Sequence, residues 1–176
     1  MRVILFYNGK TGFTKRYADW IAQELNCEVK PFKDFEKTKV GEDDLVIFGS
    51  RIYAGRIERL NKIKSRVKDN LIVFASGATP ITAENSISKI WAENFTETER
   101  EAIPHFYMQS GLNYEKMGFI DRSIMKNVAK IMGKQKGKTA DEASFAEAIR
   151  SSYDISSREY IIPLIQCVKD KADAAF

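Results

Sequence analysis

The chain has 176 residues, 44% of them apolar, which is enough for one well-filled core and too short for two ordinary domains. No run approaches the roughly 18 apolar residues that span a bilayer, and the basic side chains are mixed with 24 acidic ones without a nucleic-acid-binding signature. A single histidine and two distant cysteines argue against a histidine-based triad, a zinc site and a disulfide framework. We therefore expect one cytoplasmic domain over residues 1–176, with no metal and no nucleic acid bound.

Strand-like and helical patterns alternate along the chain, which is typical of a parallel sheet covered by helices on both faces. Five short apolar runs are predicted to be strands, at 3–7, 27–29, 45–48, 71–75 and 105–109. The predicted helices cover about 14–25, 57–67, 79–91 and 156–172. The third should open at Thr79-Pro80, and the last should be capped by Ser156 and kinked by Pro163. These elements predict an α/β fold, a doubly wound five-stranded parallel sheet of order 2-1-3-4-5 in a three-layer sandwich.

In such a sheet, the loops that leave the first, third and fourth strands should converge on one ligand. All three loops are rich in small residues, which let the backbone approach a ligand and offer amide and hydroxyl donors. Their residues are Gly9, Lys10, Thr11, Gly12, Phe13 and Thr14 in the first loop, Ser50, Arg51, Ile52, Tyr53, Ala54 and Gly55 in the second, and Ser76, Gly77 and Ala78 in the third. Because the first loop leads from a buried strand into a helix N-terminus, it is predicted to hold a phosphate group.

Part of this pattern is shared with a known family. The spacing of the flavodoxin signature is matched by Leu5-Phe6-Tyr7, Gly12, Thr14, Ala18 and Ile21, and the chain resembles that family. The resemblance implies FMN as cofactor, with its phosphate on the amides of residues 9–14 and the hydroxyls of Thr11 and Thr14. It also implies that the flavin ring lies between the second and third loops, with Tyr53 stacked on it. Gly9 stands where flavodoxins carry Ser or Thr, and Lys10 either replaces that missing donor as a point charge or points into solvent.

The segment from Ser110 to Gly133 resembles a second pattern, that of the menaquinone-dependent protoporphyrinogen dehydrogenases. These are flavodoxin-like FMN enzymes with a long insertion near the fifth strand. The resemblance implies an inserted basic helical segment at about 112–142, and an FMN-dependent oxidoreductase with a quinone or a redox protein as its partner. Two alternatives stay open, a flavodoxin-type electron carrier between protein partners and a non-redox module for another phosphate ligand. A net charge of +4 and a pI near 9.0 argue against the ordinary acidic carrier.

The inserted segment is strongly basic. Between Tyr114 and Lys138 it has seven basic and two acidic side chains. Its basic stripe is Arg122, Lys126 and Lys130, and its apolar stripe is Ile120, Ile124, Val128 and Ile131. Such a helix at 116–138 either touches an anionic membrane surface, which would make the protein membrane-peripheral, or packs its apolar stripe on the sheet with its lysines in water. The polar stretch 134–142 is predicted to be a flexible connection, and Met117, Met125 and Met132 to fill the core.

Overall fold

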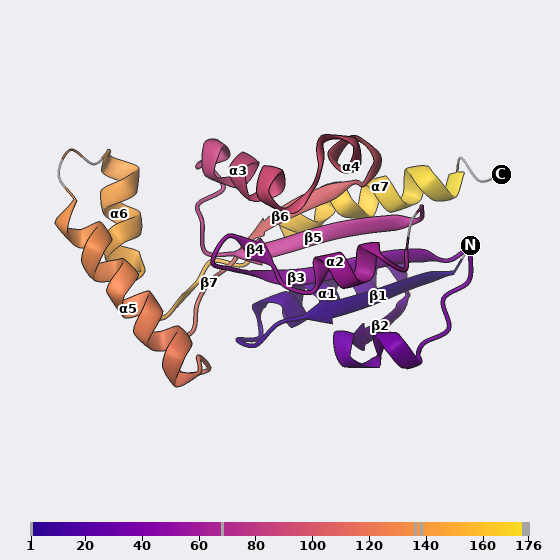
Figure 1. Cartoon of the computed structure of the whole chain (residues 1–176), viewed down its shortest axis with the longest axis horizontal. Coiled ribbons are helices and arrows are strands. Elements are labelled where there is room, and N and C mark those ends of the chain that lie inside the picture. Colours follow the sequence, from indigo (N-terminus) through magenta and orange to yellow (C-terminus); the bar gives the residue numbers. More distant parts are fainter. Residues whose placement is uncertain (1, 68, 136, 138, 174–176) are drawn as a thin grey trace.

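The computed structural model describes residues 2–67, 69–135, 137 and 139–173 of the chain. Its central sheet has parallel strands in the order β2-β1-β3-β5-β6. The strands are β1 (Val3–Asn8), β2 (Glu28–Pro31), β3 (Leu45–Tyr53), β5 (Leu71–Gly77) and β6 (His105–Gln109). The short β4 (Arg56–Ile57) turns back antiparallel on the end of β3 and stands outside this order. The predicted α/β doubly wound fold with strand order 2-1-3-4-5 is therefore confirmed (Figure 1).

Both faces of the sheet are covered, because successive strand residues point to opposite sides. Leu45 and Ile47 of β3 enter one core cluster, while Val46 and Phe48 enter the other. The first cluster is completed by α1 (Phe13–Leu25) and α7 (Ile162–Asp173), and the second by the 3-10 helix η1 (Phe32–Lys37), α2 (Leu60–Lys64) and α3 (Glu84–Asn94). The short helix α4 (Glu97–Ala102) follows α3 before the chain enters β6. The loops border the carboxyl ends of the strands.

Two predicted helix starts are wrong, in each case because the chain makes contacts outside the local pattern. The helix expected at 57–67 shrinks to α2, since β3 runs on to Tyr53 and pairs with β4. The helix expected from Thr79 begins only at Glu84. The carbonyl of Thr79 accepts a hydrogen bond from Tyr107 at 2.7 Å, and the amide of Ile81 donates to Gln109 at 2.9 Å. These bonds hold the loop against β6 in a non-helical path.

The predicted start of the last helix is also wrong. The chain first forms the 3-10 helix η2 (Arg158–Ile161), where the side chain of Ser157, not Ser156, accepts from the amide of Glu159. Helix α7 begins at Ile162, so Pro163 falls in its first turn and produces no kink.

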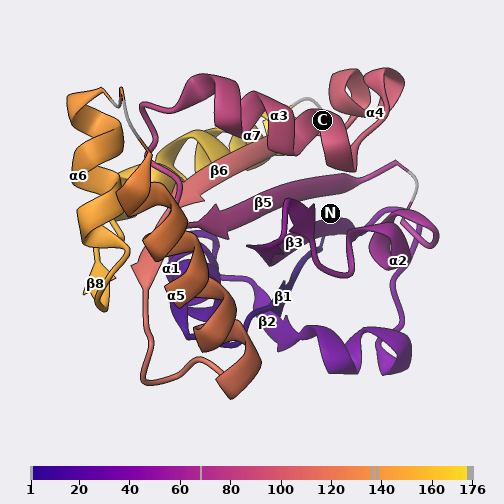
Figure 2. The ribbon, with the colours of Figure 1, turned by 60° about the vertical axis from the view of Figure 1, so that its left-hand side comes forward.

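The predicted insertion leaves the sheet at its carboxyl edge. The excursion runs further than the predicted 112–142 and consists of β7 (Gly111–Leu112), α5 (Phe119–Lys134), α6 (Ala140–Ala148) and β8 (Tyr153–Asp154), with β7 and β8 paired antiparallel. Figure 1 shows α5 and α6 as an arm beyond the sheet, and Figure 2 shows α5 crossing in front of the strand ends. Lys136 and Lys138, in the predicted flexible connection, lie outside the described residues. None of the helices in the described ranges combines the length and apolar content needed to cross a bilayer.

The arm has a small core of its own. Leu112, Tyr114, Ala129 and Ile149 are buried together, and the three methionines pack against them as expected. Of the two alternatives for α5, the one in which its apolar stripe packs on the sheet is wrong, because Ile120 and Ile131 are 70% and 65% exposed. The face that α5 buries is instead the one that carries Met125, Ala129 and Met132.

Candidate functional site

A cavity of about 340 Å³ lies at the carboxyl ends of β1, β3 and β5, between the sheet edge and α5. The residues of the three predicted loops that line it are Thr11, Phe13, Thr14, Arg51, Ile52, Tyr53, Ala54, Ser76, Gly77 and Ala78. The structure thus brings most of the predicted site residues around one space, as expected where strand order reverses. A volume of this size is at the lower end of the range for small-molecule sites.

The first loop turns into α1 through Gly12, which has φ +98° and serves as the N-cap residue. No side chain caps this helix, so its first amides have no intrahelical partner and carry the positive end of the helix dipole. A second hollow of about 280 Å³ adjoins the cavity at this loop, and Arg16 and Lys116 are among its lining residues. The loop therefore offers backbone donors and nearby cations to an anion.

The structure explains the glycine at position 9. A Cβ on Gly9 would lie 2.8 Å from Oγ1 and 2.9 Å from Cβ of Thr14. Thr14 is held there by a 2.7 Å hydrogen bond between its hydroxyl and that of Ser76, and it is only 2% exposed. A larger residue at position 9 would therefore displace Thr14 and break the link between the first and third loops.

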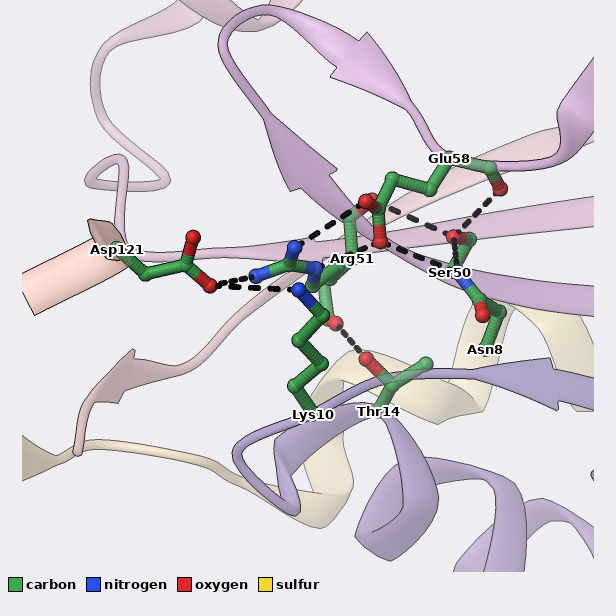
Figure 3. Close-up of polar contacts among 8 residues, drawn as sticks. Asn8, Lys10, Thr14, Ser50, Arg51, Glu58 and Asp121 are labelled. Atoms are coloured by element: carbon green, nitrogen blue, oxygen red, sulfur yellow. Dashed lines mark hydrogen bonds and ion pairs between the residues drawn. The ribbon is translucent and has the colours of Figure 1, made fainter. Parts of the chain in front are cut away.

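Three of the predicted site residues, Lys10, Ser50 and Arg51, form or support an ion-pair network beside the cavity (Figure 3). Arg51 donates from Nε and Nη2 to both carboxylate oxygens of Glu58, at 2.7 and 3.1 Å, and from Nη1 to Asp121 at 3.1 Å. Lys10 approaches the same Asp121 oxygen at 3.6 Å. Ser50 is fully buried and donates to the carbonyl of Glu58. The network joins the first and second loops to α5.

Lys10 thus has a role that neither sequence interpretation named, since it pairs with a carboxylate of the insertion. Gly55 also lies off the cavity, at the β3–β4 turn with φ +78°. Tyr53 lines the cavity, but the Arg51 guanidinium lies 4.8 Å from the centre of its ring, so one face of the ring already has a cation above it.

The charges in this network stabilise one another. The hydrogen bond from Arg51 lowers the pKa of Glu58 below its ordinary value, against the opposing effect of burial. Burial works against the charge of Arg51, but its bonds to Glu58 and Asp121 outweigh that effect and raise its pKa. Arg51 therefore stays charged at the cavity wall under all ordinary conditions.

Sequence reasoning missed the wall of the cavity that the insertion builds. Its residues are Gly111, Leu112, Met117, Asp121, Ile124, Met125, Val128 and Phe145, and Thr79 and Ser110 from outside the insertion complete the lining. Most are apolar and face the polar loops across the space. Asp121 stood out in the sequence as an acidic residue in the first turn of a basic helix. Its partner Arg51 on β3 could not be predicted, because the two residues are distant in sequence. The site is therefore polar where the loops line it and mostly apolar where the insertion lines it.

Comparison with known sequences identifies the family. The chain matches the family described as "Flavodoxin domain" over residues 4–139. It belongs to that family. The flavodoxin domain therefore includes the sheet and most of the arm. Among solved structures, the chain is similar to one titled "Structure of a flavodoxin from the domain Archaea", at 16% identity over 86% of this chain and 100% of that one, with a TM-score of 0.36. No curated protein matches the chain.

Proposed function

We propose that this flavodoxin domain binds FMN in the cavity at the sheet edge and works as a redox protein. The observation that carries the proposal is one cavity bordered by three loops and by the uncapped N-terminus of α1. The flavin would supply the electron chemistry, and the protein would bind, orient and tune it. Support for a phosphate end comes from the amides of residues 9–14 and from Thr11, which lines both hollows.

The residues at the other end fit a flat ring. Gly77 lines the cavity, and a Cβ there would lie 3.2 Å from both Ile52 Cδ1 and the Tyr107 hydroxyl oxygen. Glycine therefore leaves backbone surface for a ligand where an added Cβ would crowd two neighbouring side chains. Arg51 lines the cavity with its charge compensated by Glu58 and Asp121, so the wall is polar there without a net positive charge. The Thr14 hydroxyl is bonded to that of Ser76, so its main role is to hold the first and third loops together and not to donate to a ligand.

The purified protein is expected to be yellow and to bind one FMN. Gly12→Ala should weaken FMN binding about tenfold, because an L side chain at φ +98° costs about 1–2 kcal/mol. The matched control is Gly118→Ala, since Gly118 is the N-cap of α5, has φ −62° and has open space around its Cβ position. Absorption spectra and calorimetric titration of the apoprotein with FMN measure the binding of both variants. A colourless protein that takes up no added FMN, or binds another phosphate compound in its place, would overturn the proposal.

Within this function, we propose an oxidoreductase acting on an apolar substrate, in preference to a carrier that meets only protein partners. Support comes from the arm, whose Met125, Val128 and Phe145 add an apolar wall that a phosphate loop alone does not require. A quinone or a porphyrinogen has the flat apolar body that such a wall accepts. An assay with protoporphyrinogen and menadione tests this form of the proposal. Oxidation should exceed the non-enzymatic background, and its absence would leave the electron carrier as the function.

A further inference from the structure

Several large apolar side chains of helix α5 are exposed to water. Ile120, Ile124 and Ile131 are 70%, 44% and 65% exposed, and Phe119 at the helix start is 88% exposed. On a helix with 3.6 residues per turn, the three isoleucines fall on one face, and they are the exposed members of the apolar stripe. Scattered exposed hydrophobic residues are normal, but a continuous stripe along one helix marks an interaction surface.

Basic side chains flank this stripe on the side of α5 that faces away from the cavity. A groove of about 400 Å³ between α5 and the end of α6 has Lys126, Lys130, Lys134 and Arg150 in its lining. An adjoining hollow of about 290 Å³ shares two of them and adds Arg122. We call these five cations the basic groove. Among the side chains that the structure describes, the acidic ones beside it are Glu147, paired with Arg150 at 3.2 Å, and Glu115, bonded to Ser152 at 2.6 Å.

We infer that α5 docks flat on an anionic lipid bilayer, with the apolar stripe in the interface and the basic groove on headgroup phosphates. Charge complementarity supports an anionic surface, since five cations outnumber two carboxylates there. The residue types favour lipid over an acidic protein. Lysine is depleted in protein interfaces, whereas membrane-surface helices combine lysines with exposed aliphatic and aromatic residues. Long lysine side chains reach headgroups while their stems lie along apolar surface.

The docked orientation would bring the cavity to the membrane. Ile124 belongs to the apolar stripe and also lines the cavity, so the two surfaces are continuous. A lipid-soluble electron acceptor would then reach the cavity without crossing water. This consequence rests on the proposed function, whereas docking itself does not.

Sedimentation with vesicles of phosphatidylglycerol and phosphatidylcholine tests the docking. The protein should pellet with them, and much less with phosphatidylcholine alone. Lys126→Gln with Lys130→Gln should weaken binding about thirtyfold, since each of the two lysines contributes about 1 kcal/mol near an anionic surface. Ile120→Ser with Ile131→Ser should weaken it by a similar factor. The matched control is Lys33→Gln with Lys37→Gln, an exposed pair of the same spacing on η1, and it should bind as the unaltered protein does.

Each other outcome contradicts the inference. Equal binding by all variants, or no binding by the unaltered protein, would overturn it. Loss in the lysine pair but not in the isoleucine pair would indicate a site for soluble anions or an acidic protein. Thermal unfolding checks that each variant is folded. FMN titration of the same samples keeps the two proposals separate, because failure to dock with FMN still bound contradicts only the docking.

Discussion

Gly49→Ala is expected to lower the free energy of unfolding by about 3 kcal/mol, at the upper end of the range for overpacked cores. Gly49 on β3 is the register partner of Phe74 on β5. A Cβ at position 49 would lie 1.9 Å from Cζ of the Phe74 ring, and that ring is fully buried. Because Leu5, Ile47 and α1 close the space around the ring, the ring has no free volume to move into.

Urea unfolding followed by circular dichroism measures this effect. The matched control is Gly41→Ala, where the nearest atom to the new Cβ would be Asp44 Oδ2 at an ordinary 3.5 Å. Adding Phe74→Leu to Gly49→Ala should restore part of the loss, because a smaller side chain would face the new methyl group. A Gly49→Ala protein as stable as the control would show that the sheet relaxes around position 49.

Gly111→Ala is expected to weaken FMN binding about a hundredfold, a change of about 3 kcal/mol, while the central sheet stays folded. A Cβ on Gly111 would lie 2.0 Å from the carbonyl oxygen of Tyr153 and 3.0 Å from Cα of Asp154. Both atoms belong to the backbone, so no side-chain rotation relieves the clash and β7 must separate from β8. That pairing closes the base of the arm, whose helices build one wall of the cavity.

FMN titration and thermal unfolding together test this expectation. Affinity should fall sharply, with the main unfolding transition of the sheet retained. Gly118→Ala is again the control, because it makes the same substitution inside the arm where nothing lies within 4 Å. Unchanged FMN affinity in Gly111→Ala would mean that the arm is not needed for the cavity.

Local sequence patterns were sufficient to predict the parallel strands of the central sheet and helix α1, because these depend on neighbouring residues. The runs at 3–7 and 105–109 became strands at those positions, and the stripe of Tyr17, Ala18 and Ile21 became the buried face of α1. Alternation of strands and helices predicted the order of the sheet, since right-handed crossovers leave few arrangements. The convergence of three loops followed from that order.

The errors lie where a distant residue competes with the local pattern. Thr79 and Pro80 look like a helix start, but Tyr107 and Gln109 of β6 hold the loop that contains them. The apolar stripe of α5 looks like a buried face, yet the helix buries a neighbouring face on its own small cluster. Hydrophobic periodicity indicates that a helix has an apolar side, but it does not indicate which part of the protein covers that side.

The sequence by itself determined the alternation of elements, the three small-residue loops and the family to which they belong. Only the tertiary structure decided what surrounds those loops. Asp121 meets Arg51 and Lys10 across the cavity, and Gly9 is required by its contact with Thr14. The physical reason is that hydrophobic periodicity and turn chemistry act over a few residues. Ion pairs and steric contacts depend on positions that only the folded chain brings together.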